Sequence, residues 1–299
     1  MKGTMEKREA RAAWVMMAPA LIVIAVVAIW PVMNTFYMSM HEMVLTKPQD
    51  GQPFVFLDHY IKFFQNTEAL GALGFTFLFT VTSVFLELIL GMVIAVLMNK
   101  TFKGRGLFRA TMLVPWAVPT SVAALMMKFF FNDQYGVFND VIVRLGLSDH
   151  YIAWLGTPGG AFFAVVFADV WKTSAYMGLL ILAGLQMVPE SMYESAKIDG
   201  AGVFTRFFKI TIPVIKNTIL VAMLFRTLDA FRAFDMIQVM TNGGPGGSTE
   251  TMSMYAYTNL MSYMDFGYGS TVAVVTFVVI FLISMIYMKL MGNKLTDVD

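Results

Sequence analysis

Residues 188–213 read VPESMYESAKIDGAGVFTRFFKITIP and lie between two long apolar runs. Pro189 suits the first turn of a helix, and the two glutamates that follow favour its positive N-terminal end. Asp199-Gly200 predicts a helix stop, because glycine adopts the left-handed conformation at low cost. A second helical pattern then places phenylalanines on one face, and Pro213 is expected to interrupt the chain before the next apolar run. This 188–213 segment therefore predicts a helix, a sharp turn and a second helix, anchored at both ends in apolar sequence.

The composition places the chain in a membrane. Hydrophobic residues make up 58% of its 299 residues and charged residues 14%, and the mean hydropathy of +0.67 exceeds that of soluble domains. A net charge of +1 gives no indication of a nucleic-acid partner. There is no cysteine, and the three histidines (His41, His59 and His150) are too scattered for a zinc cluster, so we expect no metal site.

Six apolar runs predict an all-α, polytopic fold with six transmembrane helices. We expect residues 1–299 to form a single membrane domain with spans at 14–38, 73–98, 110–131, 161–187, 214–240 and 271–291. A cleaved signal peptide is the alternative for the first run, which is about twice the length of a signal-peptide core. Pro115 and Pro119 predict a kink in the third span, with freed carbonyls that either packing or a polar pathway must satisfy.

The distribution of positive charge predicts the orientation of the spans. Most of the 21 lysines and arginines fall at the N-terminus, after the second span, in the 188–213 segment or in the C-terminal tail. Lys47, Lys62 and Arg144 are the ones expected on the other side. Because cytoplasmic loops carry the excess of positive charge, both termini and the 188–213 segment are expected to be cytoplasmic.

Several charged residues fall inside the predicted spans, where each costs about 2.5–3.5 kcal/mol on insertion scales. In the fifth span they recur every three residues, so that opposite charges share a helix face and can neutralise one another. Asp169 and Lys172 have the same spacing, and Trp171 between them could stack on a sugar ring. These residues either hold the spans together or border a polar route for a hydroxyl-rich solute. The candidate pathway residues are Glu87, Asp169, Trp171, Lys172, Arg226, Asp229, Arg232 and Asp235.

The 188–213 segment also carries a recognisable motif. Glu194-Ser195-Ala196 and Asp199-Gly200-Ala201, followed by Phe207, Ile210 and Pro213, resemble the EAA loop of permease subunits in binding-protein-dependent ABC importers. Ser195 stands where that motif usually has alanine. The resemblance implies a type I ABC importer permease fold with a cytoplasmic coupling helix that docks in a cleft of the ATPase subunit. The ATPase-coupling residues it implies are Glu194, Ser195, Ala196, Asp199, Gly200 and Ala201.

A second motif narrows the resemblance. Residues 234–250, FDMIQVMTNGGPGGSTE, are similar to the exit of the fifth span in carbohydrate-type ABC permeases, and in particular to maltose- and trehalose-permease-like subunits. Consecutive glycines and a proline predict a non-helical turn at the outer mouth. The resemblance implies that a solute-binding protein docks there, on Asn242, Gly243, Gly244 and Pro245.

The chain contains no phosphate-binding Gly-x-x-x-x-Gly-Lys-Ser/Thr motif, so we expect ATP and Mg²⁺ to bind a partner and not this chain. The resemblance implies a permease without enzymatic activity that imports a sugar, for example trehalose or maltose, across a bacterial or archaeal cytoplasmic membrane. The implied partners are two ABC ATPase subunits, a second permease (usually a different chain), an extracytoplasmic sugar-binding protein and the lipid bilayer.

Two other functions remain open at this point. One is a secondary transporter of a polar solute, driven by an ion gradient and using Glu87, Asp169 and the charges of the fifth span as a relay. The other is a membrane-embedded enzyme. The absence of an internal repeat counts against the secondary transporter. The absence of a converging nucleophile or metal cluster counts against the enzyme.

Overall fold

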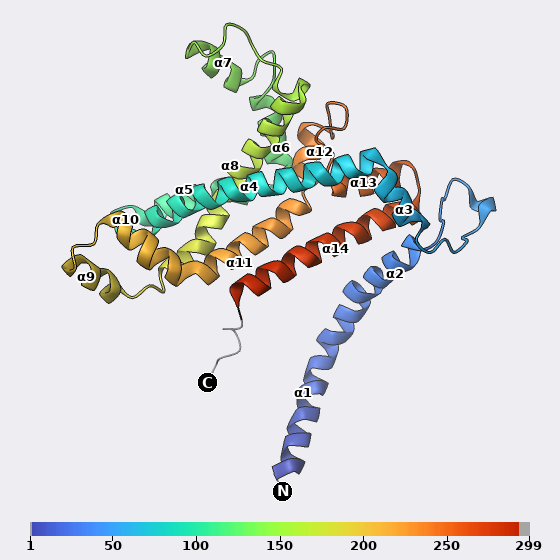
Figure 1. The fold of residues 1–299 in the computed structure, drawn as a ribbon, viewed down its shortest axis with the longest axis horizontal. Coiled ribbons are helices and arrows are strands. Elements are labelled where there is room, and N and C mark those ends of the chain that lie inside the picture. Colours follow the sequence, from blue (N-terminus) through green and yellow to red (C-terminus); the bar gives the residue numbers. More distant parts are fainter. Residues whose placement is uncertain (1, 293–299) are drawn as a thin grey trace. The chain divides into compact units, whose positions relative to one another are not determined.

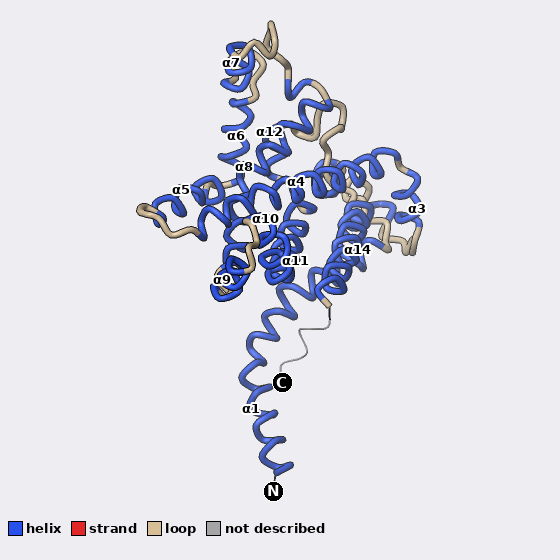
Figure 2. The backbone as a smooth tube through the Cα atoms, turned by 60° about the vertical axis from the view of Figure 1, so that its left-hand side comes forward, coloured by secondary structure: helices blue, strands red, loops and turns tan. Residues whose placement is uncertain are grey.

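The computed structural model describes residues 2–292 and shows an all-α chain (Figures 1 and 2). Within this range the only β-type pairings are two isolated bridges. The chain divides into two compact units, residues 2–66 with 256–275 and residues 67–255 with 276–292. The single membrane domain expected over residues 1–299 stays a prediction, because this division follows compactness and not membrane topology.

The first unit begins with one helix that is long and apolar enough to span a membrane from Ala10 to Ser39. It combines α1 (Lys2–Ile24), a π-helical turn (Ala25–Ile29) and α2 (Trp30–Ser39). Pro31 lacks the N–H of a regular turn, and the wider π turn ahead of it, closed by a bond from the Trp30 amide to the Ala25 carbonyl, keeps the helix continuous. At its end Ser39 is buried, and its hydroxyl lies 2.8 Å from the Tyr60 hydroxyl. The loop that follows contains a 3₁₀ turn (Pro48–Asp50) and α3 (Asp58–Gln65).

The second unit contains the crossing helices that form the core. Its elements are α4 (Thr67–Asn99), α5 (Arg105–Ala117), α6 (Thr120–Phe130), α7 (Val137–Arg144), a 3₁₀ turn (Trp154–Gly156), α8 (Pro158–Leu185), α9 (Glu190–Ile198), α10 (Val203–Arg206), a π turn (Phe207–Thr211), α11 (Ile212–Phe231) and α12 (Asp235–Met240). The chain ends with α13 (Met252–Tyr257), a π turn (Thr258–Ser262) and α14 (Phe266–Met291), which cross the division between the units. Sequence analysis missed α13.

Small residues bring α4 and α8 into close contact. A Cβ atom on Gly91 would lie 2.7 Å from the Cγ of Met177 and 3.0 Å from the backbone nitrogen of Gly178. Glycine is therefore required at this crossing, as is common where membrane helices approach backbone to backbone. The close crossing positions the polar residues farther along both helices.

The third span is broken more sharply than a kink. Helices α5 and α6 meet at an angle of 88°. Val118 adopts an extended conformation (ψ 133°), the conformation favoured for a residue that precedes proline, and Pro119 continues it (ψ 137°). Pro115, by contrast, lies inside α5 without ending it.

The fifth span differs from its prediction at both ends. The helix runs without a break from Val203 to Phe231, so Pro213 does not interrupt the chain as expected. The π turn before Pro213 accommodates the missing N–H, with the Ile212 amide bonded to the Phe207 carbonyl. At the other end the helix stops at Phe231 and α12 begins at Asp235, whereas a continuous span to residue 240 was expected.

The described residues contain five helices long and apolar enough to cross a membrane, and six candidate spans if the bent α5–α6 pair is one span. Within the second unit, α9 and α10 lie at one end of α8 and α11, and α12 lies at the other end (Figure 1). The fold therefore separates the 188–213 segment from the glycine-rich turn by the length of a span.

Candidate functional site

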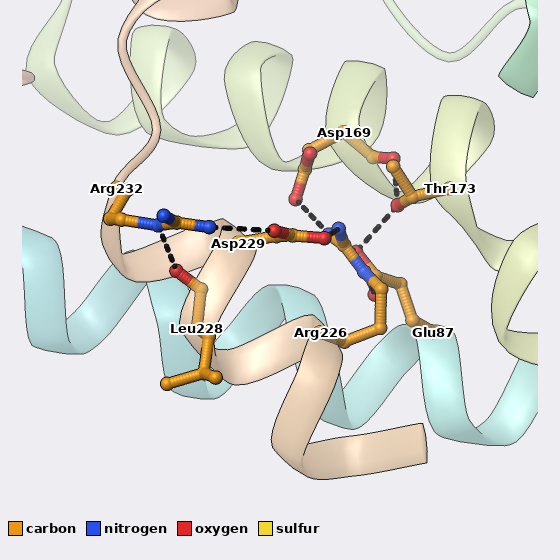
Figure 3. Close-up of polar contacts among 7 residues, drawn as sticks. All are labelled: Glu87, Asp169, Thr173, Arg226, Leu228, Asp229 and Arg232. Carbon is orange, nitrogen blue, oxygen red and sulfur yellow. Dashed lines mark hydrogen bonds and ion pairs between the residues drawn. The ribbon is translucent and has the colours of Figure 1, made fainter. Parts of the chain in front are cut away.

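A buried cluster of charges joins three helices of the second unit (Figure 3). Arg226 of α11 donates from Nε to Oε2 of Glu87 on α4 at 2.5 Å and from Nη2 to Oε1 at 2.8 Å. The same Nη2 lies 3.4 Å from Oδ2 of Asp169 on α8. Thr173, one turn beyond Asp169, donates its hydroxyl to Glu87 Oε1 at 2.7 Å. Glu87 is fully buried and Arg226 is 4% exposed, so the pair satisfies both charges inside the helix bundle.

The cluster continues along α11 toward solvent. Asp229 lies 3.7 Å from Nη1 of Arg226 and accepts a hydrogen bond of 3.2 Å from Nη2 of Arg232. Arg232 also donates to the Leu228 carbonyl at 3.1 Å, and 63% of its side chain is exposed. The expected ladder thus holds from residue 226 to 232. It does not extend regularly to Asp235, because the helix has ended and Asp235 begins α12 as an exposed residue.

Lys172 does not form the ion pair with Asp169 that their spacing predicted. Its ammonium donates to the main-chain carbonyls of Val118 at 2.7 Å and Trp116 at 3.1 Å. These carbonyls lie at the α5–α6 break, where regular helical hydrogen bonds are lost. Lys172 is 7% exposed, so its buried charge is used to satisfy the backbone of the broken span.

These groups line a cavity of about 280 Å³. Its wall is polar, and it includes side chains that sequence analysis did not select, Trp116 and Thr120 from the two sides of the break. The Trp116 ring stacks on Tyr176 with their centroids 5.2 Å apart and their planes 5° apart. The residues lining the cavity are Trp116, Thr120, Asp169, Lys172, Thr173, Arg226, Asp229, Arg232, Ala233, Phe234, Asp235 and Met236.

Two sequence-selected residues lie outside this wall. Trp171 is half-buried and packs against the hydrophobic core, and the aromatic residues that line the cavity are Trp116 and Phe234. Glu87 lies behind the wall and contacts it through Arg226 and Thr173. Thr173 could have been selected from the sequence, because it lies one helical turn from Asp169. Trp116 could have been selected as well, because it lies between the two prolines of the third span.

The bend at Gly200 closes α9 with a Schellman motif. The Ala201 amide donates to the Ala196 carbonyl at 2.8 Å, and the Gly200 amide donates to the Lys197 carbonyl at 3.0 Å. Gly200 has a φ of +76°, which an L-amino acid with a side chain adopts only with strain. Glu194, Ser195 and Asp199 are exposed beside it, and Ala196 and Ala201 are half-buried.

The glycine-rich turn at the other end of the second unit is held by threonine hydroxyls. Thr249 is fully buried and donates to the Gly244 carbonyl at 2.8 Å, while its hydroxyl lies 2.8 Å from that of Thr241. Asn242 is exposed, Gly243 is buried, and Gly244 and the cis-linked Pro245 are half-buried.

An acidic pair lies next to this turn. Burial and the nearby charge of Glu68 raise the pKa of the Glu250 carboxyl above its ordinary value. The protonated form of Glu250 is therefore favoured by the folded structure. Glu250 was not among the sequence-selected residues.

Comparison with known proteins identifies relatives over nearly the full chain. The trehalose/maltose transport system permease protein of Thermococcus litoralis is 45% identical over 282 residues, covering 94% of each chain. The sulfoquinovosyl glycerol transport system permease protein of Agrobacterium fabrum is 39% identical and covers 93% of this chain and 90% of its own. The trehalose transport system permease protein of Mycobacterium tuberculosis is 34% identical, with 95% and 90% covered.

The solved structures agree on the fold. A chain of a bacterial alginate ABC transporter, crystallised with an alginate pentasaccharide-bound periplasmic protein, superposes with a TM-score of 0.80 over 98% of this chain and 97% of its own at 18% identity. Residues 87–297 match the family model described as "Binding-protein-dependent transport system inner membrane component". The expected type I permease fold is thereby confirmed, and the chain belongs to the family of binding-protein-dependent transport system inner membrane components.

Proposed function

We propose that this chain is the permease subunit of an ATP-driven importer that carries a sugar across a bacterial or archaeal cytoplasmic membrane. The observation that carries the proposal is the 45% identity, over 94% of the chain, to a trehalose/maltose transport permease. The descriptions of all three named relatives give a sugar or a sugar glycoside as the transported solute. Trehalose and maltose are therefore the first substrates to test.

The polar cavity supports a hydroxyl-rich solute. Asp169, Asp229 and Arg232 offer acceptors and donors at its wall, which can replace the water that a sugar loses. Trp116 supplies an aromatic ring, stacked on Tyr176, of the kind that packs against sugar rings. In this proposal the solute passes the wall formed by α5, α8 and α11.

The bend at Gly200 supports docking of a separate ATPase. Large apolar side chains are exposed around it, with Ile198 87% and Phe204 80% exposed. Large apolar side chains exposed close together along the chain favour a protein interface. The partners in the proposal are two ATPase subunits that bind ATP and Mg²⁺, a second and different permease, and an extracytoplasmic sugar-binding protein that docks on the 242–245 turn. Both termini and the bend are cytoplasmic.

The test is uptake by the complete complex in proteoliposomes. The permease pair, the ATPase and the sugar-binding protein are reconstituted, and uptake of labelled trehalose or maltose is measured with ATP or with a proton gradient alone. We expect uptake that requires both ATP and the binding protein. Uptake driven by the gradient in vesicles without the ATPase would refute the proposal and favour a secondary transporter.

The route through the cavity has a separate test. Asp229→Ala and Arg232→Ala variants should lower uptake while the complex still assembles. Normal uptake by both variants would remove the route assignment while leaving the importer function intact.

A further inference from the structure

A cleft lined in part by the 188–213 segment has been given no ligand so far. It consists of two cavities, of about 260 Å³ and about 600 Å³, at the ends of α4 and α8 and beside α9 and α10. The two cavities share four lining residues, so they form one continuous cleft. The shared residues are Asn99, Lys100, Leu185 and Tyr193.

The cleft has an apolar part and a basic part. Val96, Val203 and Phe207 line the smaller cavity. Lys100 and Arg105 line the larger one, together with one carboxylate, Glu190. Including Arg206 in the smaller cavity, three cations face one anion. A ligand that fits both parts is amphipathic and negatively charged.

One donor on a residue that lines the cleft lacks a partner. The Nε atom of Arg206 is buried and has no hydrogen-bond acceptor among the residues that the structure describes. Neighbouring polar groups are already satisfied: the Tyr193 hydroxyl lies 2.8 Å from that of Thr211, which donates to the Arg206 carbonyl at 3.4 Å. A buried guanidinium donor without an acceptor is costly, and a phosphate oxygen is the acceptor that arginine matches best.

The basic part is built on fixed backbone. Arg105 donates from Nε to the Met98 carbonyl at 3.0 Å, and Arg109 donates to the same carbonyl from Nε at 3.3 Å and from Nη2 at 2.9 Å. These bonds hold the 100–105 loop against the end of α4, where cations also interact favourably with the helix dipole. The Arg105 side chain is therefore held at the cleft before any ligand arrives.

We propose that this cleft binds a phosphate group, and that its source is the headgroup of an anionic phospholipid. The shared chemistry of a lipid phosphate and free phosphate is recognised by Arg206, Lys100 and Arg105, and the apolar part of the cleft favours the lipid. The placement of the cleft at the cytoplasmic surface, where anionic lipids concentrate, rests on the orientation in the proposed function.

The experiment measures lipid retained by the full-length chain. The purified protein in detergent is mixed with equal amounts of phosphatidylglycerol and phosphatidylcholine, and bound lipid is counted by native mass spectrometry. We expect preferential retention of phosphatidylglycerol, and a loss of about fivefold in affinity for each cation removed, in Arg206→Gln and in Lys100→Gln. Lys209→Gln is the matched control, because Lys209 is exposed on the same continuous helix and does not line the cleft.

The outcomes separate the sources of the phosphate. Equal loss in the Lys209 control, or equal retention of the two lipids, would overturn the proposal. Displacement of phosphatidylglycerol by millimolar inorganic phosphate would keep a phosphate site but overturn the lipid as its source. If Arg206→Gln does not fold, the exposed Lys100 carries the test alone. Lipid binding is measured in an assay that does not depend on transport. The result can therefore be interpreted even if the proposed importer function is wrong.

Discussion

Replacing Arg226 should destabilise this protein more than replacing its partner Glu87. Removal of the guanidinium leaves two buried or nearly buried carboxylates, Glu87 and Asp169, without a cation in contact. Breaking a buried pair in this way costs about 3–5 kcal/mol, so Arg226→Met should fall in that range. In Glu87→Gln, two aspartates still face Arg226 and Arg232, and the amide oxygen still accepts. Glutamine offers one acceptor oxygen where Glu87 offers two, so one of the two bonds from Arg226 is lost and the other becomes a neutral-acceptor bond, at a cost of about 2–3 kcal/mol in total.

The assay is the free energy of unfolding in a denaturing-detergent titration, measured for both single variants and for the double variant. The double variant should lose less than the sum of the singles, because Glu87→Gln removes one carboxylate that Arg226→Met would strand. Arg232→Met is the control, since its exposed pair with Asp229 contributes less than about 1 kcal/mol. Additivity within about 0.5 kcal/mol, or a larger loss for Glu87→Gln than for Arg226→Met, would refute the reasoning.

Three further predictions concern the break, the bend and the outer turn. Lys172→Met leaves two carbonyls at the α5–α6 break without a hydrogen-bond donor, at about 1–3 kcal/mol each, and should abolish most uptake in the proteoliposome assay. The control is Lys128→Met, which removes a single exposed bond to the Val239 carbonyl and should leave uptake near normal. Gly200→Val places a β-branched residue at φ +76° and should uncouple ATP hydrolysis from uptake. The control is Gly202→Val, which changes a glycine at φ −67° and should leave the two coupled. Coupled uptake in both variants would contradict a role for the bend. The pKa of Glu250 is raised, so its contribution to stability is complete below its ordinary pKa of 4.5 and is lost as the pH rises through the folded-state pKa. Glu250→Gln should therefore raise the melting temperature at pH 7 and leave it nearly unchanged at pH 4. Equal shifts of the melting temperature at both pH values would be inconsistent with the burial of this carboxyl.

Local patterns predicted the helices well, because they depend on neighbouring residues. The 188–213 segment shows this: Asp199-Gly200 predicted the end of a helix, and the structure closes α9 there with a Schellman motif. Pro213 shows the limit of the same reasoning. A proline is expected to interrupt a helix, but a single π turn ahead of it absorbed the missing N–H.

The partners of the buried charges could not be predicted from spacing. Asp169 and Lys172 are three residues apart, and a helix wheel pairs them, yet Asp169 contacts Arg226 and Lys172 binds carbonyls of another span. Arg226 and Glu87 are 139 residues apart in sequence, so only the packing of α4 against α11 brings them together. The roles of the charges as a solute route and of the 242–245 turn as a docking surface stay predictions.

The unbroken helix from Val203 to Phe231 has a mechanical consequence. Its first turn belongs to the segment that carries the bend at Gly200, and Arg226 lies near its far end, about 35 Å away at 1.5 Å per residue. A rigid rod of this length amplifies rotation: a tilt of about 10° pivoted at one end displaces the other by about 6 Å. That displacement exceeds the reach of an ion pair, so a modest rotation of this helix relative to α4 would separate Arg226 from Glu87.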